Sequence, residues 1–571
     1  MLVNVPTMKA KVTASGVKIY KTAHHHQETW PSLLLGVVKH FCLITGLHGY
    51  KFIVLPKRML LERVIWAIIC LSSLVCVVII LCSAWKNFKQ HPVISMTEST
   101  SYPIWNYEFP AVTVCNHNKV SRKKALDVAK NFTVTNGKTT EELIRDFRHF
   151  LVLLINDDWE LPGDSYKDLD ALLKDNGFNT GDVLKAVAPS CDDMIVSCKW
   201  KGEEKRCDAI FEVVRTAEGF CCSFNYFALR KHSFKKIFGK KMQKQPRRVT
   251  SCGYLTGLEI LLDNDFNDYL ATSIPAIGYN ILIHHPRHFP NINIQNTMVN
   301  MRTVNHISVD PKLMHSTTSL KYIPVKLRRC LFSYERFLAT YERYSYHNCF
   351  VECKRNMTLK FCGCVPYKYA HLKGDGQMVC SFEDIPCLIR HRPVIEASVP
   401  GPGITRPTSF SSHDYGWEES ECGCLPDCEV TQYVSEKSIG RLNRKYSTSD
   451  VILYGGLHIQ NQSVVRVYFK DLVAKKMKWD VVFTWHTLLA FCGGLLGLFV
   501  GFSFVSLLEV AYFFSVRLLI VSTRGEEAET QLKKKPSKVV PLYQSFNPGK
   551  VNIPNNAELH KYKLNSHFLN Y

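Results

Sequence analysis

Two long apolar stretches, one near each end of the chain, stand out in the pattern of hydrophobic and polar residues. The first, from Val64 to Trp85, holds 22 residues without a charge. As a helix rising about 1.5 Å per residue it would reach roughly 33 Å, enough to cross a bilayer. The second covers residues 481–521, and its first 28 residues carry no acidic or basic side chain apart from His486. The pattern predicts two membrane-spanning helices, the second with length to spare.

The second stretch contains four glycines within nine residues, at Gly493, Gly494, Gly497 and Gly501. Glycine costs about 1 kcal/mol in a helix, so the cluster indicates either close helix packing or backbone that leaves the helix. Non-helical backbone at membrane depth persists only where protein buries it or where it lines a water-filled path. Glu509 follows in the same segment, and intramembrane carboxylates usually mark pathways or partners. These features predict a pore segment.

Basic residues beside both stretches set the expected orientation. Residues 1–63 carry nine Lys and Arg against two Glu, and residues 517–571 carry nine against four, out of a formal net charge of +21. Such bias marks the cytosolic side and favours contact with anionic lipid. No basic stripe with a recognisable fold is present, which argues against nucleic-acid binding. We expect a plasma-membrane protein with these parts: a cytosolic region 1–63, a span 64–85, an extracellular domain 86–480, a span 481–521 and a cytosolic tail 522–571.

Cysteines and glycosylation sequons support this topology. Of 22 cysteines, 17 lie between Cys115 and Cys428, inside the expected extracellular domain. The three N-x-S/T sequons, at Asn131, Asn356 and Asn461, lie there too. Dense cysteine belongs in oxidising compartments, and sequons are glycosylated only outside the cytosol. The sequence predicts a disulfide-rich extracellular glycoprotein domain.

Ten cysteines crowd into the last part of that domain. They are Cys330, Cys349, Cys353, Cys362, Cys364, Cys380, Cys387, Cys422, Cys424 and Cys428. Zinc is the rival interpretation of such close pairs, but an even number in an extracellular setting favours five disulfide bridges and no metal. The insert Leu388–Glu421, rich in Pro, Ser and Gly, is expected to be a flexible loop.

Local patterns predict a mixed α+β domain without catalytic machinery. Phe109–Asn116 is rich in β-branched residues and predicts a strand, Thr140–Asn156 has helical spacing, and residues 251–310 resemble strands. His284 and His285 are either a metal pair or, as we favour, surface histidines at a strand end. The run His24–His26 is expected to be a solvated polar segment. No phosphate-binding loop or nucleophile motif is present, so we expect no enzyme activity and no cofactor.

Five motifs in order resemble the epithelial sodium channel/degenerin superfamily, which includes the acid-sensing channels. They are His48–Gly49, FPAVTVCN after the first span, YSYHNCFVEC leading to CGCVPY, CGCLPDC with Tyr433, and GGLLGLFVGFSFVSLLE. The match covers residues 48 to about 512. The motif EGFCCSFN and the residues of the last motif are most similar to those of the insect pickpocket branch.

The resemblance implies a trimer whose subunits have a β-rich palm, a finger, and a helical, disulfide-laced thumb. It implies the bridges Cys330–Cys428, Cys349–Cys424, Cys353–Cys422, Cys362–Cys387, Cys364–Cys380, Cys115–Cys221 and Cys198–Cys207. Cys191, Cys222 and Cys252 are left over, and three cysteines cannot all pair within one chain.

The resemblance also implies roles in the membrane. Gly501, Phe502 and Ser503 would form the selectivity filter, since a filter must offer oxygen ligands in place of an ion's water. Gly497 would lie at the amiloride-blocker position, although Gly497-x-x-x-Gly501 also fits a plain packing motif. The remaining assignments are Ala490 at the degenerin position, Glu509 in the cytosolic vestibule or beside a nearby Arg or Lys, and His48–Gly49 in gating.

The resulting functional hypothesis is a subunit of a homo- or heterotrimeric, amiloride-sensitive channel permeable to Na⁺. The gating stimulus, an extracellular ligand or a mechanical tether, stays open, as does the degree of selectivity, since Phe502 is bulkier than its counterpart in many relatives. Arg328 replaces a thumb-base tryptophan, which argues against proton gating. The alternatives are a surface receptor or adhesion glycoprotein without a pore, and an ATP-gated trimeric channel, whose cysteine pattern does not match.

Overall fold

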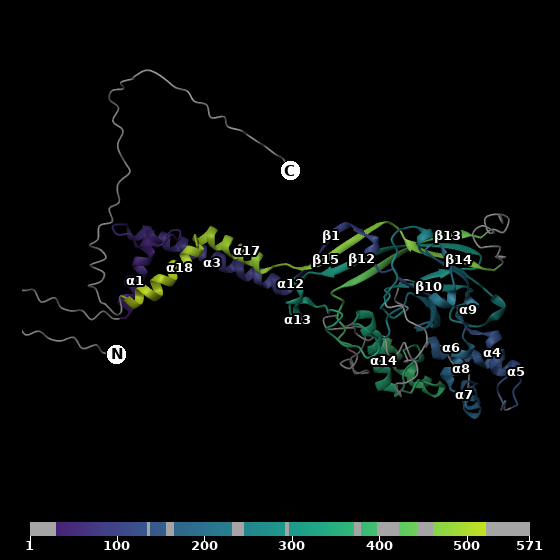
Figure 1. Ribbon diagram of the computed structural model, residues 1–571. Helices are drawn as coiled ribbons and strands as arrows, with labels where there is room; N and C mark the ends of the chain where they lie inside the picture. The colour runs from purple at the N-terminus through teal and green to yellow at the C-terminus, as the bar shows by residue number, and fades with distance from the viewer. Residues whose placement is uncertain are drawn as a thin grey trace, which may run out of the picture. The chain divides into compact units, whose positions relative to one another are not determined.

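The computed structural model describes residues 30–133, 137–155, 165–230, 245–291, 296–369, 378–396, 422–442 and 461–520. They fall into two units, drawn in Figure 1. The small unit combines Met1–Cys82 with Leu489–Tyr571, and the large unit is Ser83–Leu488. The predicted polar run His24–His26 and the predicted cytosolic tail 522–571 lie outside the described residues.

The small unit is helical. Its elements are α1 (Trp30–Ile44), α2 (Tyr50–Val54), the first part of α3 (Leu60–Gln90), most of α17 (Trp485–Val500), α18 (Phe504–Ala511) and the π-helical turn η9 (Tyr512–Arg517). Within the described ranges α3 is by itself long and apolar enough to cross a membrane. Helices α17 and α18 pass the same test only as a pair, which is bent by 73° at their junction.

Both apolar stretches differ in detail from the sequence prediction. Helix α3 extends beyond 64–85 at each end and includes polar residues such as Glu62 and Lys89 in its first and last turns. The second stretch is not one helix over 481–521: Val481 ends a strand, and α17 begins at Trp485. Helices α1 and α2, absent from the prediction, precede α3.

The large unit is built on an eight-stranded sheet with the order β1-β15-β12-β14-β8-β4-β5, while β13 pairs with β12. The alternating burial of β12 leaves one of its faces in the core, as expected of a sheet that is covered on one side. The strands are β1 (Val93–Pro103), β4 (Ile195–Trp200), β5 (Glu203–Lys205), β8 (Leu258–Leu262), β12 (Thr303–Ser316), β13 (Val430–Arg441), β14 (Ser463–Phe469) and β15 (Val473–Val481).

A five-stranded sheet, ordered β11-β10-β2-β7-β6, packs against the first through a shared core. The predicted strand at Phe109–Asn116 is confirmed as β2, and aromatic rings of Phe109, Trp200 and Phe224 meet beside it at centroid distances of 4.8 to 6.1 Å. Its strands are β2 (Ala111–Asn116), β6 (Phe211–Thr216), β7 (Gly219–Phe224), β10 (Tyr279–His284) and β11 (Asn296–Val299), and a separate pair joins β3 (Asn118–Ser121) to β9 (Tyr269–Thr272).

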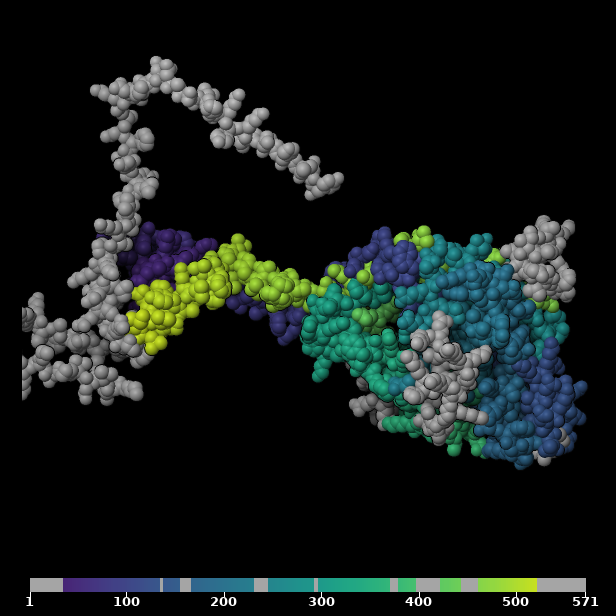
Figure 2. All heavy atoms as spheres, viewed as in Figure 1, coloured from purple at the N-terminus to yellow at the C-terminus, as the bar shows by residue number. Residues whose placement is uncertain are grey.

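Two helical groups lie on the same side of these strands in Figure 1, and their atoms fill the lower part of the large unit in Figure 2. One group, the finger helices, comprises α4 (Arg122–Ala129), α5 (Thr140–Asp146), α6 (Phe150–Ile155), α7 (Ser165–Asp175) and α8 (Thr180–Val187). The other, the thumb helices, comprises α14 (Tyr346–Cys362) and α15 (Ile385–Glu396). The groups share a core in which the rings of Phe150 and Phe382 lie 5.5 Å apart.

Five disulfides run along the thumb. The structure contains Cys330–Cys428, Cys349–Cys424, Cys353–Cys422, Cys362–Cys387 and Cys364–Cys380, in the pairs that the resemblance implies. The insert predicted as a loop over Leu388–Glu421 begins differently. Its first residues continue α15 as far as Glu396, with Pro393 inside the helix, because Val394 and Ile395 are buried against the thumb core. Residues 397–421 lie outside the described part.

The rest of the large unit contains three further bridges. Cys115–Cys221 ties β2 to β7, Cys198–Cys207 closes the β4–β5 hairpin, and Cys191–Cys222 joins two of the cysteines left over from the sequence comparison. Cys252, the third, is free. The short helices are α9 (Cys191–Met194), α10 (Cys207–Ile210), α12 (Thr318–Lys321) and α13 (Val325–Arg328), with single turns at η1 (Ile104–Asn106), η2 (Phe147–His149), η3 (Tyr254–Thr256), η4 (Phe266–Asp268), η5 (Tyr367–Tyr369) and η6 (Phe382–Asp384).

Candidate functional site: a helix break beside a His-Gly turn

The backbone leaves the helix at the predicted filter tripeptide. Helix α17 ends at Val500, and Gly501 adopts a left-handed conformation with φ of +72°. Its N–H donates to the Gly497 carbonyl at 3.0 Å, which closes the last turn. A left-handed residue just after a helix end is most often glycine, because a side chain there strains the backbone. Gly501 is therefore the glycine of the cluster that ends the helix.

Ser503 starts the next helix. Its hydroxyl accepts a hydrogen bond from the Ser506 N–H at 3.2 Å, and the Ser503 N–H donates to the Ser506 hydroxyl at 3.3 Å. This reciprocal cap satisfies backbone groups that a new helix leaves without partners. Phe502 lies between the two helix ends, with its N–H donating to the Leu496 carbonyl at 3.2 Å. The tripeptide therefore interrupts the helix in a hydrogen-bonded conformation, with the Ser503 hydroxyl at its C-terminal end.

The His48 backbone contacts this interruption directly. Its N–H donates to the Val500 carbonyl at 3.0 Å. A Cβ added to Gly501 would lie 2.6 Å from Cδ2 of the His48 ring, closer than real Cβ contacts. Two features thus require glycine at 501: its left-handed φ angle and the His48 imidazole, which leaves no room for a Cβ. Two motifs separated by about 450 residues in the chain meet here.

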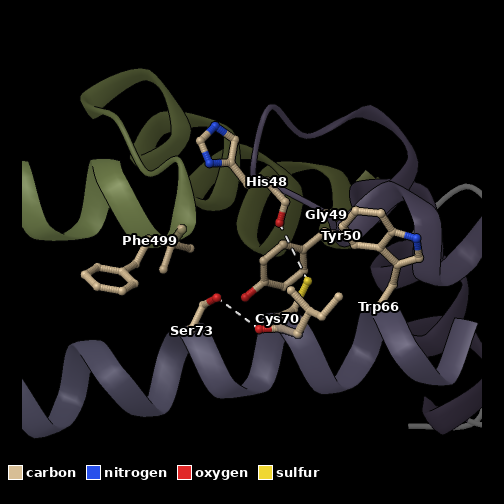
Figure 3. A pocket seen from close by; sticks show the side chains of 9 residues that line it. His48, Gly49, Tyr50, Trp66, Cys70, Ser73 and Phe499 are labelled. Atoms are coloured by element: carbon tan, nitrogen blue, oxygen red, sulfur yellow. Dashed lines mark hydrogen bonds between the residues drawn. The ribbon is translucent and has the colours of Figure 1, made fainter.

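Gly49 places the same turn against α3. It caps α2 with φ of +81°, and a Cβ on it would lie 2.9 Å from the Cys70 sulfur and 3.3 Å from the Trp66 ring. The Cys70 thiol in turn donates to the His48 carbonyl at 3.7 Å (Figure 3). The His-Gly turn therefore lies between α3 and the end of α17. The Cys70 thiol bonds it to α3, and the His48 amide bonds it to α17.

Glu509 and α1 form the neighbouring contact. The Thr45 hydroxyl donates to the Glu509 carboxylate at 3.4 Å. Helix α1 packs on η9 through a small cluster in which the rings of Phe41 and Phe513 lie 5.5 Å apart. Within the described ranges Glu509 has no ion pair with an Arg or Lys, so the partner considered from the sequence is replaced by a threonine hydroxyl.

Ala490 and Gly497 lie on α17 with open space around them. Ala490 is exposed, and Gly493 and Gly494 have no heavy atom within 4 Å of an added Cβ. Gly497 has only the Phe502 carbonyl oxygen, at 3.9 Å. Within one subunit nothing in the described chain packs against this face of α17.

In the large unit, the first of the two predicted surface histidines, His284, is buried, and the second, His285, is half-buried. His284 is 3% exposed, and its ring exchanges a hydrogen bond with the Thr113 hydroxyl at 2.8 Å. The rings of His285 and His288 are 4.6 Å apart, and His288 lies 5.2 Å from His347 at the start of α14. Burial lowers the pKa of His284 to about 4 and of His285 to about 3. The surface interpretation was wrong because the turn after β10 is covered by the thumb.

The remaining predicted site residues lie apart from the helix break. Asn131 and Asn356 are exposed, while the side-chain oxygen of Asn461 accepts a hydrogen bond from Arg302 at 3.0 Å. Over the described ranges, the one cluster of three possible metal ligands is Cys364, Cys380 and Asp384. Its two cysteines are joined as a disulfide, so they offer no thiolate to a metal.

Comparison with known proteins gives the family. The sequence model described as amiloride-sensitive sodium channel matches residues 41–513. The chain belongs to this family. It is 24% identical over 510 residues to the sodium channel protein Nach of Drosophila melanogaster, covering 87% of this chain and 90% of that protein. Pickpocket protein 28 of the same fly is 23% identical, with 84% and 78% covered.

A vertebrate relative extends the comparison. Acid-sensing ion channel 4 of the mouse is 25% identical over 493 residues, which cover 82% of this chain and 77% of that one. These relatives are consistent with the epithelial sodium channel/degenerin superfamily and its insect pickpocket branch. Members of the amiloride-sensitive sodium channel family are ion channels, not enzymes.

Sequence reasoning missed several residues around the break. Thr45, Tyr50, Trp66 and Cys70 all contact the His-Gly turn or its neighbours. The available signal was weak: Trp66 and Cys70 are four residues apart on a predicted helix, and so face the same way. Nothing in the sequence indicated which partner that face would meet.

Proposed function

We propose that this protein is a subunit of a trimeric, sodium-permeable, amiloride-sensitive cation channel. The observation that carries the proposal is the interruption at Gly501–Phe502–Ser503, held by the backbone of His48. A simple membrane anchor has no use for a broken span with two special backbone positions. The family membership supplies the class of function, a sodium channel.

The topology follows from the two apolar segments. We propose that α3 and the α17–α18 pair both cross the plasma membrane, that both termini are cytosolic, and that residues 86–480 are extracellular. The exposed apolar side chains of α3 suit a lipid environment. Eight disulfides within the large unit suit an oxidising compartment. We also propose that Asn131, Asn356 and Asn461 carry glycans on this extracellular side.

The filter is assigned to Gly501, Phe502 and Ser503 from three subunits. A break in the helix leaves carbonyl oxygens without intrahelical partners, and Ser503 adds a hydroxyl. Oxygen atoms ringed around an axis replace part of the water shell of Na⁺. The open face of α17 at Ala490 and Gly497 is where the three helices would line the outer pore and bind the blocker.

Gating is assigned to the His48–Gly49 turn. It bonds to the last carbonyl of α17 and to Cys70 of α3, so a shift of α3 changes the position of the filter backbone. Glu509, beside Thr45, supplies negative charge to the cytosolic vestibule and favours cations. The stimulus is an extracellular chemical or mechanical one, received by the large unit, and the partners are the same or related subunits.

Voltage-clamp recording of the expressed chain, alone and with related subunits, tests the proposal. Ala490→Val should produce a constitutive sodium current that amiloride reduces, because a larger side chain on this face of α17 obstructs closure. Ala67→Val, the same change on α3, serves as the matched control and should carry no constitutive current. Surface-delivered Ala490→Val trimers without current in any combination would refute the channel.

A second measurement addresses the filter. Ser503→Ala removes the hydroxyl that both caps α18 and faces the break, so the reversal potential in mixed Na⁺ and K⁺ should shift toward that of a less selective pore. The substitution Ser515→Ala, at an exposed serine beyond α18, should leave the reversal potential unchanged. An unshifted reversal potential in Ser503→Ala would remove these residues from the filter.

A further inference from the structure

A cavity of about 150 Å³ lies beside the helix break, within the small unit. Three segments line it: the His-Gly turn with Tyr50, one face of α3, and the last two residues of α17 (Figure 3). Apolar protein cavities of this size take up molecules as large as benzene. The space is therefore large enough for one aromatic ring.

The walls are largely apolar and aromatic. Trp66 and Ile69 contribute from α3, and Phe499 and Val500 from α17. The ring of Trp66 is stacked on that of Phe52, with centroids 4.7 Å apart, and this contact restrains its orientation. An aromatic ring that enters the cavity would contact a Trp66 indole that is already ordered, so binding would not have to reorder it.

The polar groups in the wall already have partners. The Ser73 hydroxyl donates to the Ile69 carbonyl at 2.9 Å, and the Cys70 thiol donates to the His48 carbonyl. A buried water needs two to four polar partners, and these groups offer it little. Figure 3 shows the Tyr50 ring over α3, with its hydroxyl directed toward Ser73. That hydroxyl offers a guest one polar handle.

We propose that this cavity is a binding site for a small aromatic molecule of about one ring, weakly polar and uncharged. It is distinct from the proposed blocker position at Gly497, which does not line it. Its guest would touch both the His-Gly turn and Val500, whose carbonyl accepts the His48 amide. If the proposed function holds, an occupied cavity stabilises the turn against α17 and biases the gate; the binding itself does not depend on that function.

Cys70 provides a reporter, because its thiol lines the cavity. Purified full-length protein in detergent is treated with N-ethylmaleimide, with and without fluorobenzene as the probe, and labelling of each cysteine is followed by mass spectrometry. Fluorobenzene at ten times its dissociation constant should slow labelling of Cys70 about tenfold, by mass action. Cys76, an exposed thiol on the same helix, should be unaffected.

Two variants make the test specific. Ile69→Trp enlarges a side chain that lines the cavity, although it is 45% exposed, so fluorobenzene should no longer change the labelling rate of Cys70. Ile68→Trp places the same side chain on the neighbouring residue, which is 60% exposed and does not line the cavity, and should keep the protection. Ser73→Phe replaces Ile69→Trp if that variant elutes as aggregate in size-exclusion chromatography.

Equal slowing at Cys70 and Cys76, or protection that persists in the filled variant, would overturn the proposal. Absence of any protection up to the solubility limit of fluorobenzene would do so as well. A chain that conducts no sodium but still shows protection of Cys70 would contradict the channel function and leave the binding site standing.

Discussion

The guanidinium of Arg328 forms an ion pair with the carboxylate of Glu335 at the base of the thumb. Arg328 is 4% exposed, and it also donates to the carbonyls of Cys330 and Ile323 at 3.0 and 3.1 Å and lies over the ring of Phe332. Around it, Leu320 and Phe332 pack with Phe88 and Trp479. The buried arginine thus combines a contact with an aromatic ring and an ion pair.

Removing the acidic partner should be costly. Glu335→Ala leaves the Arg328 guanidinium buried without a counter-ion, and such changes destabilise proteins by about 3–5 kcal/mol. The thermal midpoint of the full-length protein, followed by fluorescence size-exclusion chromatography, should fall clearly. Glu436→Ala breaks the exposed pair with Lys470 and should cost less than about 1 kcal/mol. Similar shifts in both variants would show that the buried pair is not special.

The histidine cluster predicts an acid-labile contact between the end of β10 and the thumb helix α14. The pKa of His284 is lowered to about 4 and that of His285 to about 3, mainly by burial, with Arg287 adding to the effect at His285. Their unfolded forms bind protons near pH 6.5. Stability is therefore fully present above pH 6.5 and is lost as the pH falls below it, by about 2 kcal/mol at pH 5 for one such histidine.

Thermal midpoints of the full chain between pH 7.5 and pH 5 check this expectation. His284→Gln should flatten the pH dependence, while His91→Gln, at an exposed position outside the cluster, should leave its slope unchanged. Glu108, Arg287, Arg343 and His347 also face the cluster, so their substitution should change the same slope. A wild-type midpoint independent of pH over this range would contradict the prediction.

The contact between His48 and Gly501 can be measured as a coupling. Gly501→Ala places a methyl group against the imidazole and forces a left-handed alanine, which alone costs about 1–2 kcal/mol. Adding His48→Gly removes the clash but not the backbone strain, so the double variant should be more stable than the sum of the single changes. Gly36→Ala, in α1 with nothing within 4 Å, should be tolerated. If the two stability changes add strictly, the His48 ring does not contact residue 501.

Disulfide mapping tests the bridge that the family resemblance left open. Digestion of unreduced protein should yield a linked peptide of Cys191 and Cys222 and an alkylated Cys252. Replacing Cys191 and Cys222 together by alanine opens a loop closed across a sequence separation of 31, which should cost about 4 kcal/mol. Cys252→Ala is the matched change at a free thiol and should cost little. A Cys252-linked peptide would contradict the assignment.

The sequence was most predictive where one residue type carries one physical meaning. Uncharged runs marked the apolar segments, glycine marked the break, and the cysteine pattern agreed with the thumb bridges once the family resemblance was added. Contacts across long separations were out of reach. Periodicity could identify the face of α3 that bears Trp66 and Cys70, but not that the His-Gly turn would cover it. His284 was misjudged for a similar reason, since its cover, α14, begins some sixty residues later.

Strands β1 and β15 are hydrogen-bonded neighbours, with Val93 opposite Val481. Since β1 follows directly on α3 and β15 directly precedes α17, the ladder joins the two chain segments at their common exit from the large unit. The residues that lead out of α3 and those that lead into α17 are therefore held in register by backbone hydrogen bonds. Any sliding of β15 along β1 would have to break this ladder first.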